Sequence, residues 1–289
     1  MLIHEVISKT HVTKKAIEYY IEQGLLAPAA LDNGYRDFTP EQAERLQKIA
    51  VLRKLGLSTE NIREVLNATD NEALQKLSFQ KELTLQKETR RQALLEALST
   101  GTDYAQVAME LQTLEQGETI ALRLLDSFPG YYGKFICLHF SSFLNVPITT
   151  DEQKQAYEEI LAFLDNVPAL EFPKEIQDYL DEYTKQITVG QLQTMLKNIK
   201  HNMKNPEEFL TKNKELLEQY NQYLQSEEFR QSAAFRFKQM LLEFNQTSGY
   251  YDIFIPAMKR LSPAYAEYYR QIELADEKLA AQYPGSREG

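Results

Sequence analysis

The 289-residue sequence has one cysteine, no tryptophan, eleven glycines and ten prolines. The single cysteine, Cys137, excludes a disulfide framework within one chain and any metal site built from several cysteines. No stretch approaches the roughly 18 apolar residues that a membrane span needs, and the N-terminus has no apolar signal core. We therefore expect a cytoplasmic protein that has no contact with a membrane.

Catalytic motifs are lacking as well. The sequence contains no glycine-rich phosphate loop, no His-Glu-x-x-His helix and no Gly-x-Ser-x-Gly turn. Cys137 and His139 are close in sequence, but two positions on a helix point about 200° apart, so they do not form a nucleophile and base pair. The apolar neighbours of Cys137 predict a buried structural thiol. We expect a protein that is not an enzyme and that holds no cofactor and no metal.

Negative charge is distributed unevenly. The formal net charge is −10, yet residues 1–69 contain nine Lys and Arg and nine Asp and Glu, so the whole excess lies in residues 70–289. A neutral first segment can still present a basic face to phosphates, because binding depends on local Lys and Arg side chains. The acidic remainder would repel DNA from the other surfaces and favour one docking mode.

The scarcity of glycine and proline, together with apolar residues at spacings of three and four, predicts a mainly α protein with about ten helices. Thr39-Pro40 followed by Gln42 is typical of a helix start. The Asn33-Gly34 pair, with apolar residues on either side, predicts one small β-hairpin. The fold class that we expect is an N-terminal winged helix-turn-helix with one hairpin, a long helix and an all-α C-terminal domain.

Residues 70–98 contain neither glycine nor proline and predict one long helix. Four leucines on an a/d stripe are the candidate dimerisation residues: Leu74, Leu77, Leu95 and Leu98. The stripe has apolar ends and the polar middle positions Lys81, Thr84, Glu88 and Arg91. Periodicity leaves two arrangements open, namely antiparallel pairing with a second copy and packing on the chain's own second domain. The segment Ser-Thr-Gly-Thr-Asp at 99–103 is the expected boundary.

The first seventy residues combine two short helices, a hairpin and two further helices, which is the order of a winged helix-turn-helix. Lys14 and Lys15 fall in the first turn of the second helix, where a recognition helix meets phosphates and base edges. Tyr19 and Tyr20 follow, and a tyrosine hydroxyl there can donate to a phosphate while its ring packs on apolar neighbours. The hairpin, or wing, adds Tyr35 and Arg36.

Residues 3–66 resemble the DNA-binding domain of MerR-family transcription regulators. The matching motifs occur in the family's order: Val12-Thr13, Ile17-Glu18-Tyr19-Tyr20, Gly24-Leu25-Leu26, Asn33-Gly34-Tyr35-Arg36 and Gly56-Leu57-Ser58 to Ile62. Besides Lys14, the resemblance implies DNA contacts at Thr13, Lys15, Tyr19, Tyr20, Tyr35, Arg36 and Arg53. Glu18 stands where the family usually has arginine, and we expect it to pair with a nearby Lys or Arg. His4 and His11 replace family glycines and have no expected role.

The resemblance also implies how such a protein works. Residues 1–69 would be the DNA-binding domain, residues 70–99 an antiparallel dimerisation coil and residues 100–289 an effector-sensing domain. A homodimer would bind a palindromic promoter in double-stranded DNA. Effector binding would then twist or bend the promoter spacer, so RNA polymerase is affected indirectly through the DNA.

Aromatic residues gather in the C-terminal part, since 14 of 17 tyrosines and 12 of 14 phenylalanines lie after residue 103. Tyrosines can line a cavity for flat or cationic organic molecules. Four of them adjoin a glycine or proline and are the candidate ligand residues: Tyr131, Tyr132, Tyr250 and Tyr251. Such clusters also occur in closed cores. A C-terminal domain that binds a protein partner, or an enzyme domain fused to the DNA-binding head, are the alternatives.

Overall fold

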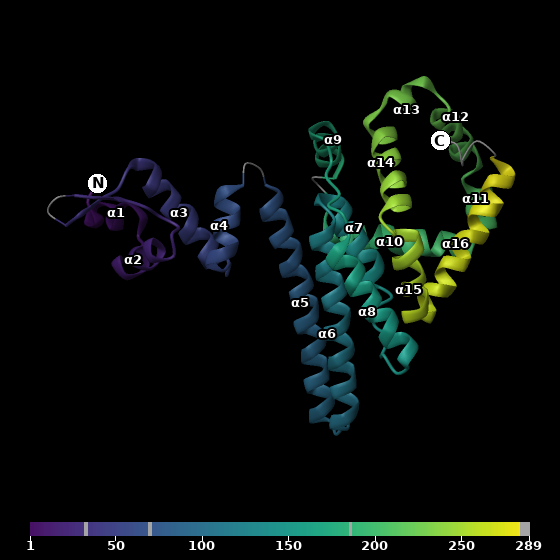
Figure 1. Cartoon of the computed structure of the whole chain (residues 1–289), viewed down its shortest axis with the longest axis horizontal. Coiled ribbons are helices and arrows are strands. Elements are labelled where there is room, and N and C mark those ends of the chain that lie inside the picture. The colour runs from purple at the N-terminus through teal and green to yellow at the C-terminus, as the bar shows by residue number, and fades with distance from the viewer. Residues whose placement is uncertain (32–33, 69–70, 185–186, 284–289) are drawn as a thin grey trace. The chain divides into compact units, whose positions relative to one another are not determined.

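A computed structural model describes residues 1–31, 34–68, 71–184 and 187–283. The chain divides into two compact units, Met1–Ser78 (unit 1) and Phe79–Gly289 (unit 2), each described by itself below (Figure 1). The described residues form sixteen α-helices, one π-helix and one two-stranded sheet, so the predicted mainly α class is confirmed. The expected helix number was too low, because the short helices between residues 206 and 231 are separated by only one or two residues.

Unit 1 contains four short helices and the hairpin. Its elements are α1 (Ile3–Thr10), α2 (Lys14–Glu22), β1 (Ala29–Ala30), β2 (Arg36–Asp37), α3 (Pro40–Lys54) and α4 (Thr59–Asn67). The two strands are antiparallel, with Ala30 opposite Arg36, and the predicted hairpin is thereby confirmed. Asn33, half of the predicted turn, lies outside the described residues. Helix α3 begins at the expected capping box, in which Thr39 and Gln42 bond each other's backbone N–H groups.

Small apolar side chains from every helix of unit 1 form its core. Val6, Ile17, Leu46, Ile49 and Ile62 are completely buried there. Because these residues come from α1, α2, α3 and α4, the core fixes the second helix against the other three. The outer surface of α2 is therefore held in a defined orientation within the unit.

The long helix α5 (Glu72–Ser99) is confirmed over nearly the predicted range. The division between the two units falls inside this helix, after Ser78. Within the expected boundary at 99–103, Ser99 ends α5 and residues 100–103 form the turn that leads into α6.

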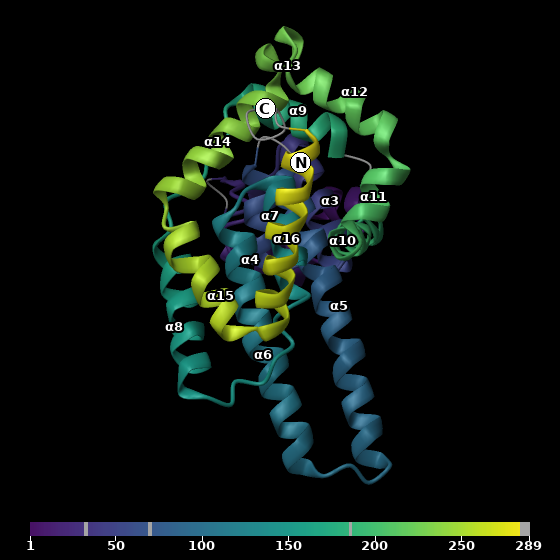
Figure 2. The same ribbon diagram turned by 90° about the vertical axis from the view of Figure 1, so that its right-hand side faces the viewer.

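Unit 2 is entirely helical in the part of the chain described. After the C-terminal part of α5 its helices are α6 (Tyr104–Ser127), α7 (Gly130–Ser141), α8 (Asp151–Asn166), α9 (Lys174–Thr184), α10 (Val189–Lys204), α11 (Pro206–Lys212), α12 (Lys214–Leu224), α13 (Glu227–Gln231), α14 (Ala233–Thr247), the π-helix η1 (Tyr250–Phe254), α15 (Ile255–Leu261) and α16 (Pro263–Gln282). Figures 1 and 2 show α5 and α6 as a hairpin of two helices that run in opposite directions. Lys87 on α5 forms an ion pair with Glu118 on α6, which joins the two helices.

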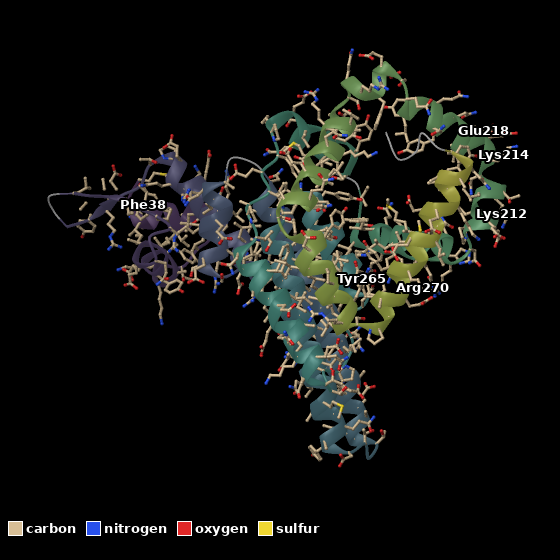
Figure 3. All side chains as sticks on the ribbon, turned by 45° about the vertical axis from the view of Figure 1, so that its right-hand side comes forward. Phe38, Lys212, Lys214, Glu218, Tyr265 and Arg270 are labelled. Carbon is tan, nitrogen blue, oxygen red and sulfur yellow. The ribbon has the colours of Figure 1, made fainter. Side chains whose placement is uncertain are left out.

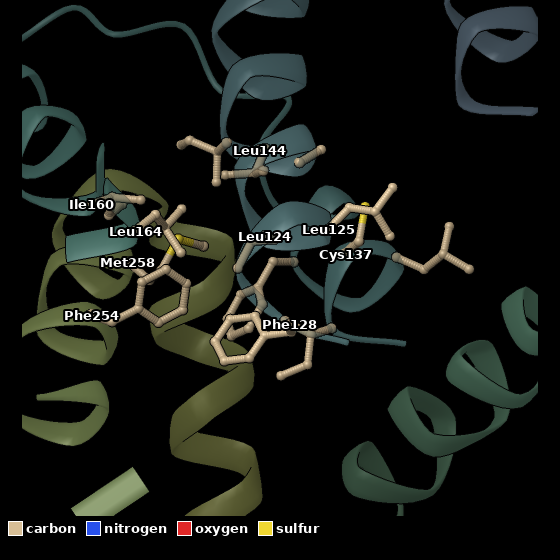
Figure 4. Packing of buried hydrophobic residues seen from close by; sticks show 14 of the residues in the cluster. Leu124, Leu125, Phe128, Cys137, Leu144, Ile160, Leu164, Phe254 and Met258 are labelled. Atoms are coloured by element: carbon tan, nitrogen blue, oxygen red, sulfur yellow. The ribbon is translucent and has the colours of Figure 1, made fainter. Parts of the chain in front are cut away.

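The core of unit 2 lies where α6, α7, α8 and α15 meet. Leu124, Ile160, Phe254 and Met258 are almost fully buried in it, and Figure 4 shows them packed together with Cys137. Cys137 is the buried thiol that the sequence predicts, and burial raises the pKa of this thiol to about 12. No helix among residues 1–31, 34–68, 71–184 and 187–283 is both long and apolar enough to cross a membrane.

Candidate nucleic-acid interface

The second helix begins at a cap that its sequence supplies. The hydroxyl of Thr13 accepts a hydrogen bond from the backbone N–H of Ala16 at 3.3 Å, which satisfies one of the unpaired N–H groups at the helix start. Val12, just before the cap, and Ile17, one turn later, are buried. The helix is thus held by its inner face, and the first-turn side chains on the other face are left to solvent.

The exposed face of α2 carries the candidate contact residues Lys14, Lys15 and Tyr19. Spacings of one, four and five residues place these side chains on one arc of the helix, opposite Ile17. Glu18 lies on the same arc, and its carboxylate is 3.8 Å from the ammonium group of Lys14. The expected pairing of Glu18 is confirmed. Because both side chains are largely exposed, this ion pair is weak and can exchange for a contact with phosphate.

The two adjacent tyrosines of α2 occupy different environments. Tyr19 is 42% exposed, whereas Tyr20 is 7% exposed and belongs to the core of unit 1. Their ring centroids are 5.8 Å apart. Tyr19 can therefore present ring and hydroxyl to a ligand, while the ring of Tyr20 mainly stabilises the helix.

The wing presents the other two candidates, Tyr35 and Arg36. Tyr35 is 60% exposed, and Arg36 is exposed on β2. The amino group of Met1 anchors the wing, because it donates to the Asp37 carboxylate at 2.7 Å and to the Phe38 carbonyl at 2.8 Å. Phe38, the next residue of the wing, is buried (Figure 3). The wing is thus fixed at its base, and its basic side chain points outward.

Three arginines of unit 1 bond to backbone carbonyl groups. Arg45 donates to the carbonyls of Leu25 and Leu66, Arg53 to that of Leu57 at 2.6 Å, and Arg63 to that of Gln23 at 2.6 Å. The candidate contact residue Arg53 thus closes the turn between α3 and α4 as well. Sequence reasoning missed the positioning role of Arg45 and Arg63, because their partners lie 20 to 40 residues away in the chain.

The candidate dimerisation leucines do not share one environment. Leu74 is 38% exposed and Leu95 is 61% exposed, whereas Leu77 is buried in the core of unit 1 and Leu98 is partly buried. On the side of α5 that faces α6, Phe79 joins the core of unit 2. The alternative of packing within the chain therefore holds for one side of α5. The opposite side remains exposed at Leu85, which is 61% accessible, and at Leu95.

Three of the four candidate ligand tyrosines lie near one another in unit 2. The pKa of Tyr250 is raised by burial first and then by the hydroxyl groups of Tyr265, Tyr132 and Tyr251. Tyr132 packs edge-on against Phe128 with centroids 5.7 Å apart, which is a core contact. Tyr131 has a pKa raised by burial alone.

A family model described as MerR HTH family regulatory protein matches residues 1–69. The HTH-type transcriptional regulator CueR of Yersinia pestis is 38% identical over 74 residues, which are 25% of this chain and 53% of CueR. The HTH-type transcriptional activator mta of Bacillus subtilis is 26% identical over 161 residues, 55% of this chain and 56% of mta. The nodulation protein NolA of Bradyrhizobium elkanii is 31% identical over 104 residues, 35% of this chain and 48% of NolA.

The chain spans about half the length of the curated relatives that it matches. No solved structure is significantly similar to it. The matched family domain coincides with the capped second helix, the anchored wing and the core that positions them. Residues 1–69 therefore form a MerR helix-turn-helix domain, and in this domain the chain resembles the MerR family of transcriptional regulators.

Proposed function

We propose that the protein regulates transcription as a homodimer that binds a palindromic promoter in double-stranded DNA and responds to a small organic effector through unit 2. The observation that carries the DNA-binding part is the exposed arc of α2, with Lys14, Lys15 and Tyr19, together with the exposed Arg36 on an anchored wing. Helix side chains in a groove and a wing side chain on phosphate are two contacts from one rigid unit. RNA polymerase responds indirectly, through the geometry of the promoter.

The exposed side of α5 supports the homodimer. One side of this helix packs within unit 2 through Phe79, Leu83 and Leu94. The other side exposes Leu85 and Leu95, and a soluble protein gains stability when a second copy covers such residues. Antiparallel pairing of two α5 helices would give the two DNA-binding units a fixed separation, which a palindromic site requires.

The tyrosine group around η1 supports an effector role for unit 2. Tyr250 and Tyr251 belong to a π-helix, a backbone form that is rare and often functional. At the end of the preceding helix α14 lie Asn245 and Ser248, and the side-chain oxygens of both are buried without a hydrogen-bond partner in the part of the chain that the structure describes. Unsatisfied buried oxygens cost stability and are commonly met by water or a bound molecule. Tyr132 lies near η1, because its hydroxyl group interacts electrostatically with that of Tyr251.

The DNA-binding part is tested by replacing Arg36 with alanine. The DNA used is a duplex selected from a random pool by the full-length protein. Loss of one phosphate contact should weaken binding by about 1–3 kcal/mol and reduce the dependence of affinity on salt. Arg230→Ala, which removes an exposed arginine from α13 of unit 2, is the matched control and should leave both quantities unchanged. Equal affinity and salt dependence for Arg36→Ala and wild type would reject this contact.

The dimer is tested on the exposed side of α5. Replacing Leu85 and Leu95 with glutamate in one variant should give a monomer in sedimentation experiments, because two like charges then face each other across an antiparallel pair. The monomer should also lose most of its affinity for the two-half-site duplex. Met109→Glu, at an exposed position of α6, is the control. A dimer that persists in the double variant would place the interface elsewhere.

A further inference from the structure

A pocket lies in unit 2 between α12, α13, α14 and α16, and we call it the arch pocket. Its volume is about 340 Å³, within the range of roughly 300–1,000 Å³ found for small-molecule sites. Leu217, Leu224, Phe229 and Leu279 supply its apolar surface. Leu224 and Phe229 are buried but stand apart from the main core of unit 2, so this apolar wall belongs to the pocket rather than to the core.

The elements around the arch pocket are held in place by side-chain contacts between helices. Lys278 on α16 pairs with Glu207 on α11 at 2.5 Å. This ion pair fixes the C-terminal end of α16 beside α11, the helix that precedes α12. The ring of Phe229 lies 5.5 Å from that of Phe235, which joins α13 to α14. The pocket therefore exists without a ligand to support it, which lowers the entropic cost of binding.

One wall of the arch pocket offers an unused hydrogen-bond acceptor. The side-chain oxygen Oδ1 of Asn221, on α12, is buried and has no hydrogen-bond partner among the described residues. An orphaned acceptor of this kind destabilises the protein until a donor reaches it. Tyr220, the neighbouring residue in the lining, is 55% exposed and marks the side that is open to solvent. A ligand that enters there can bring an N–H or O–H group to the amide oxygen of Asn221 when this side chain turns from its buried position into the pocket.

The charge in the arch pocket is positive, in contrast to the acidic chain as a whole. Among the described residues that line it, Lys238 alone is charged. Nearby on α12, the carboxylate of Glu218 already faces the ammonium of Lys214 at 3.9 Å, and Figure 3 shows these two side chains on the same helix. Lys238 would attract an anionic group and repel a cation. This pocket therefore does not suit the cationic ligands that the tyrosine content suggested.

We propose that the arch pocket binds a small organic acid with an aromatic or branched apolar body, an N–H or O–H donor for Asn221 and an anionic group for Lys238. Only its role as the effector site rests on the proposed function, since the pocket and its chemistry stand independently. The site lies at the start of α14, whereas the tyrosine group lies at its end. Occupation of the pocket would act on η1 through this single helix.

Two fluorescent probes test the chemistry on the full-length chain. Anilinonaphthalene sulfonate has an apolar body, an N–H donor and an anionic group, and N-phenylnaphthylamine lacks only the anionic group. Wild type should bind one molecule of the sulfonate per chain in a saturable manner. Lys238→Gln should weaken binding of the sulfonate about fivefold and leave the affinity for the neutral probe unchanged. The matched control Lys154→Gln, at an exposed position of α8, should change neither.

Asn221→Leu tests the role of the hydrogen-bond acceptor. It removes the orphaned acceptor, so the variant should fold at least as stably as wild type and should bind both probes about tenfold more weakly. Ala234→Trp should fill the pocket and abolish binding of both probes. If the Lys238 and Asn221 variants bind both probes as wild type does, the probes bind elsewhere and the proposed site is rejected.

DNA affinity, measured with and without saturating sulfonate, separates this site from the proposed function. A change in DNA affinity that disappears in Lys238→Gln supports the arch pocket as the effector site. Probe binding with the expected pattern but without any effect on DNA affinity overturns the effector role and leaves the binding site standing. Loss of the expected pattern while Arg36→Ala still weakens DNA binding overturns the arch pocket and leaves DNA regulation standing.

Discussion

The arginines of the two units have different partners. In unit 1, Arg45, Arg53 and Arg63 donate to backbone carbonyl groups. In unit 2, several arginines pair with carboxylates; examples are Arg123 with Asp165 at 2.9 Å and Arg236 with Glu175 at 2.6 Å. A carbonyl group holds a guanidinium group in place and leaves its positive charge uncompensated, whereas a carboxylate neutralises it.

This difference explains how an acidic protein can present a surface to DNA. Unit 1 uses its arginines to position elements and retains their charge for long-range attraction of phosphates. Unit 2 neutralises several of its arginines and has an excess of acidic residues, which disfavours DNA binding there. Net charge calculated over the whole chain conceals this division of roles.

The largest expected effect that separates the units is acid sensitivity of unit 2. Burial, assisted by the nearby charge of Lys200, lowers the pKa of His139 to about 4. His139 is surrounded by rings, among them Phe140 at 4.9 Å and Tyr268 at 5.4 Å. The pKa of His139 in the folded protein lies below its unfolded value of 6.5. Unit 2 therefore has its full stability above pH 6.5 and loses stability as the pH falls towards 4, because the unfolded chain then binds a proton that the folded chain does not. The loss should reach up to about 3 kcal/mol.

Chemical unfolding at pH 7 and at pH 4.5 measures this effect. His139→Gln should remove most of the pH dependence of unit 2 in this range, although it also removes ring contacts and lowers stability at pH 7. His201→Gln changes an exposed histidine of α10 and should leave the pH dependence intact. Unit 1 should show little change in the same range. Equal pH dependence in wild type and His139→Gln would show that His139 does not titrate as expected.

A second prediction compares the two kinds of arginine directly. Arg45→Met should destabilise unit 1 by about 1.5–3 kcal/mol, because it leaves the Leu25 carbonyl without its charged donor in a partly buried position. Arg236→Met should cost unit 2 less than about 1 kcal/mol, because both members of its ion pair are half exposed. Thermal unfolding at low and high salt is the measurement. A loss at Arg45 that is no larger than the loss at Arg236, or that shrinks at high salt, would contradict the comparison.

The smallest expected effect lies at His11, the residue that ends α1. Its φ of 55° is in the left-handed region, and it is the one non-glycine residue with positive φ among those described. Glycine adopts this conformation without steric cost, so His11→Gly should stabilise unit 1 by about 0.5–1 kcal/mol. The exposed His4, in the first turn of α1, is the control, because glycine there should destabilise the helix rather than stabilise it. A loss of stability in His11→Gly would mean that the imidazole makes a contact of its own.

Local patterns predicted the elements of unit 1 well, because caps, turns and helix periodicity act between residues that are close in sequence. Thr13, Thr39 and Ser58 each accept the N–H bond that their position at a helix start requires. The pairing of Glu18 with Lys14 follows from a spacing of four residues on one helix. The burial of Tyr20 beside an exposed Tyr19 was not anticipated, since both were expected to reach DNA.

The sequence alone determined the class of the N-terminal domain, because short-range motifs in the right order specify a MerR domain before any packing is considered. Tertiary structure decided which side chains of that domain remain available, since the exposure of Lys15 and the burial of Leu77 depend on residues from other helices. Only the tertiary structure brings the lining residues of the arch pocket together. Asn221 and Lys238 lie on different helices, and no spacing in the sequence indicates that α12, α14 and α16 enclose a common space.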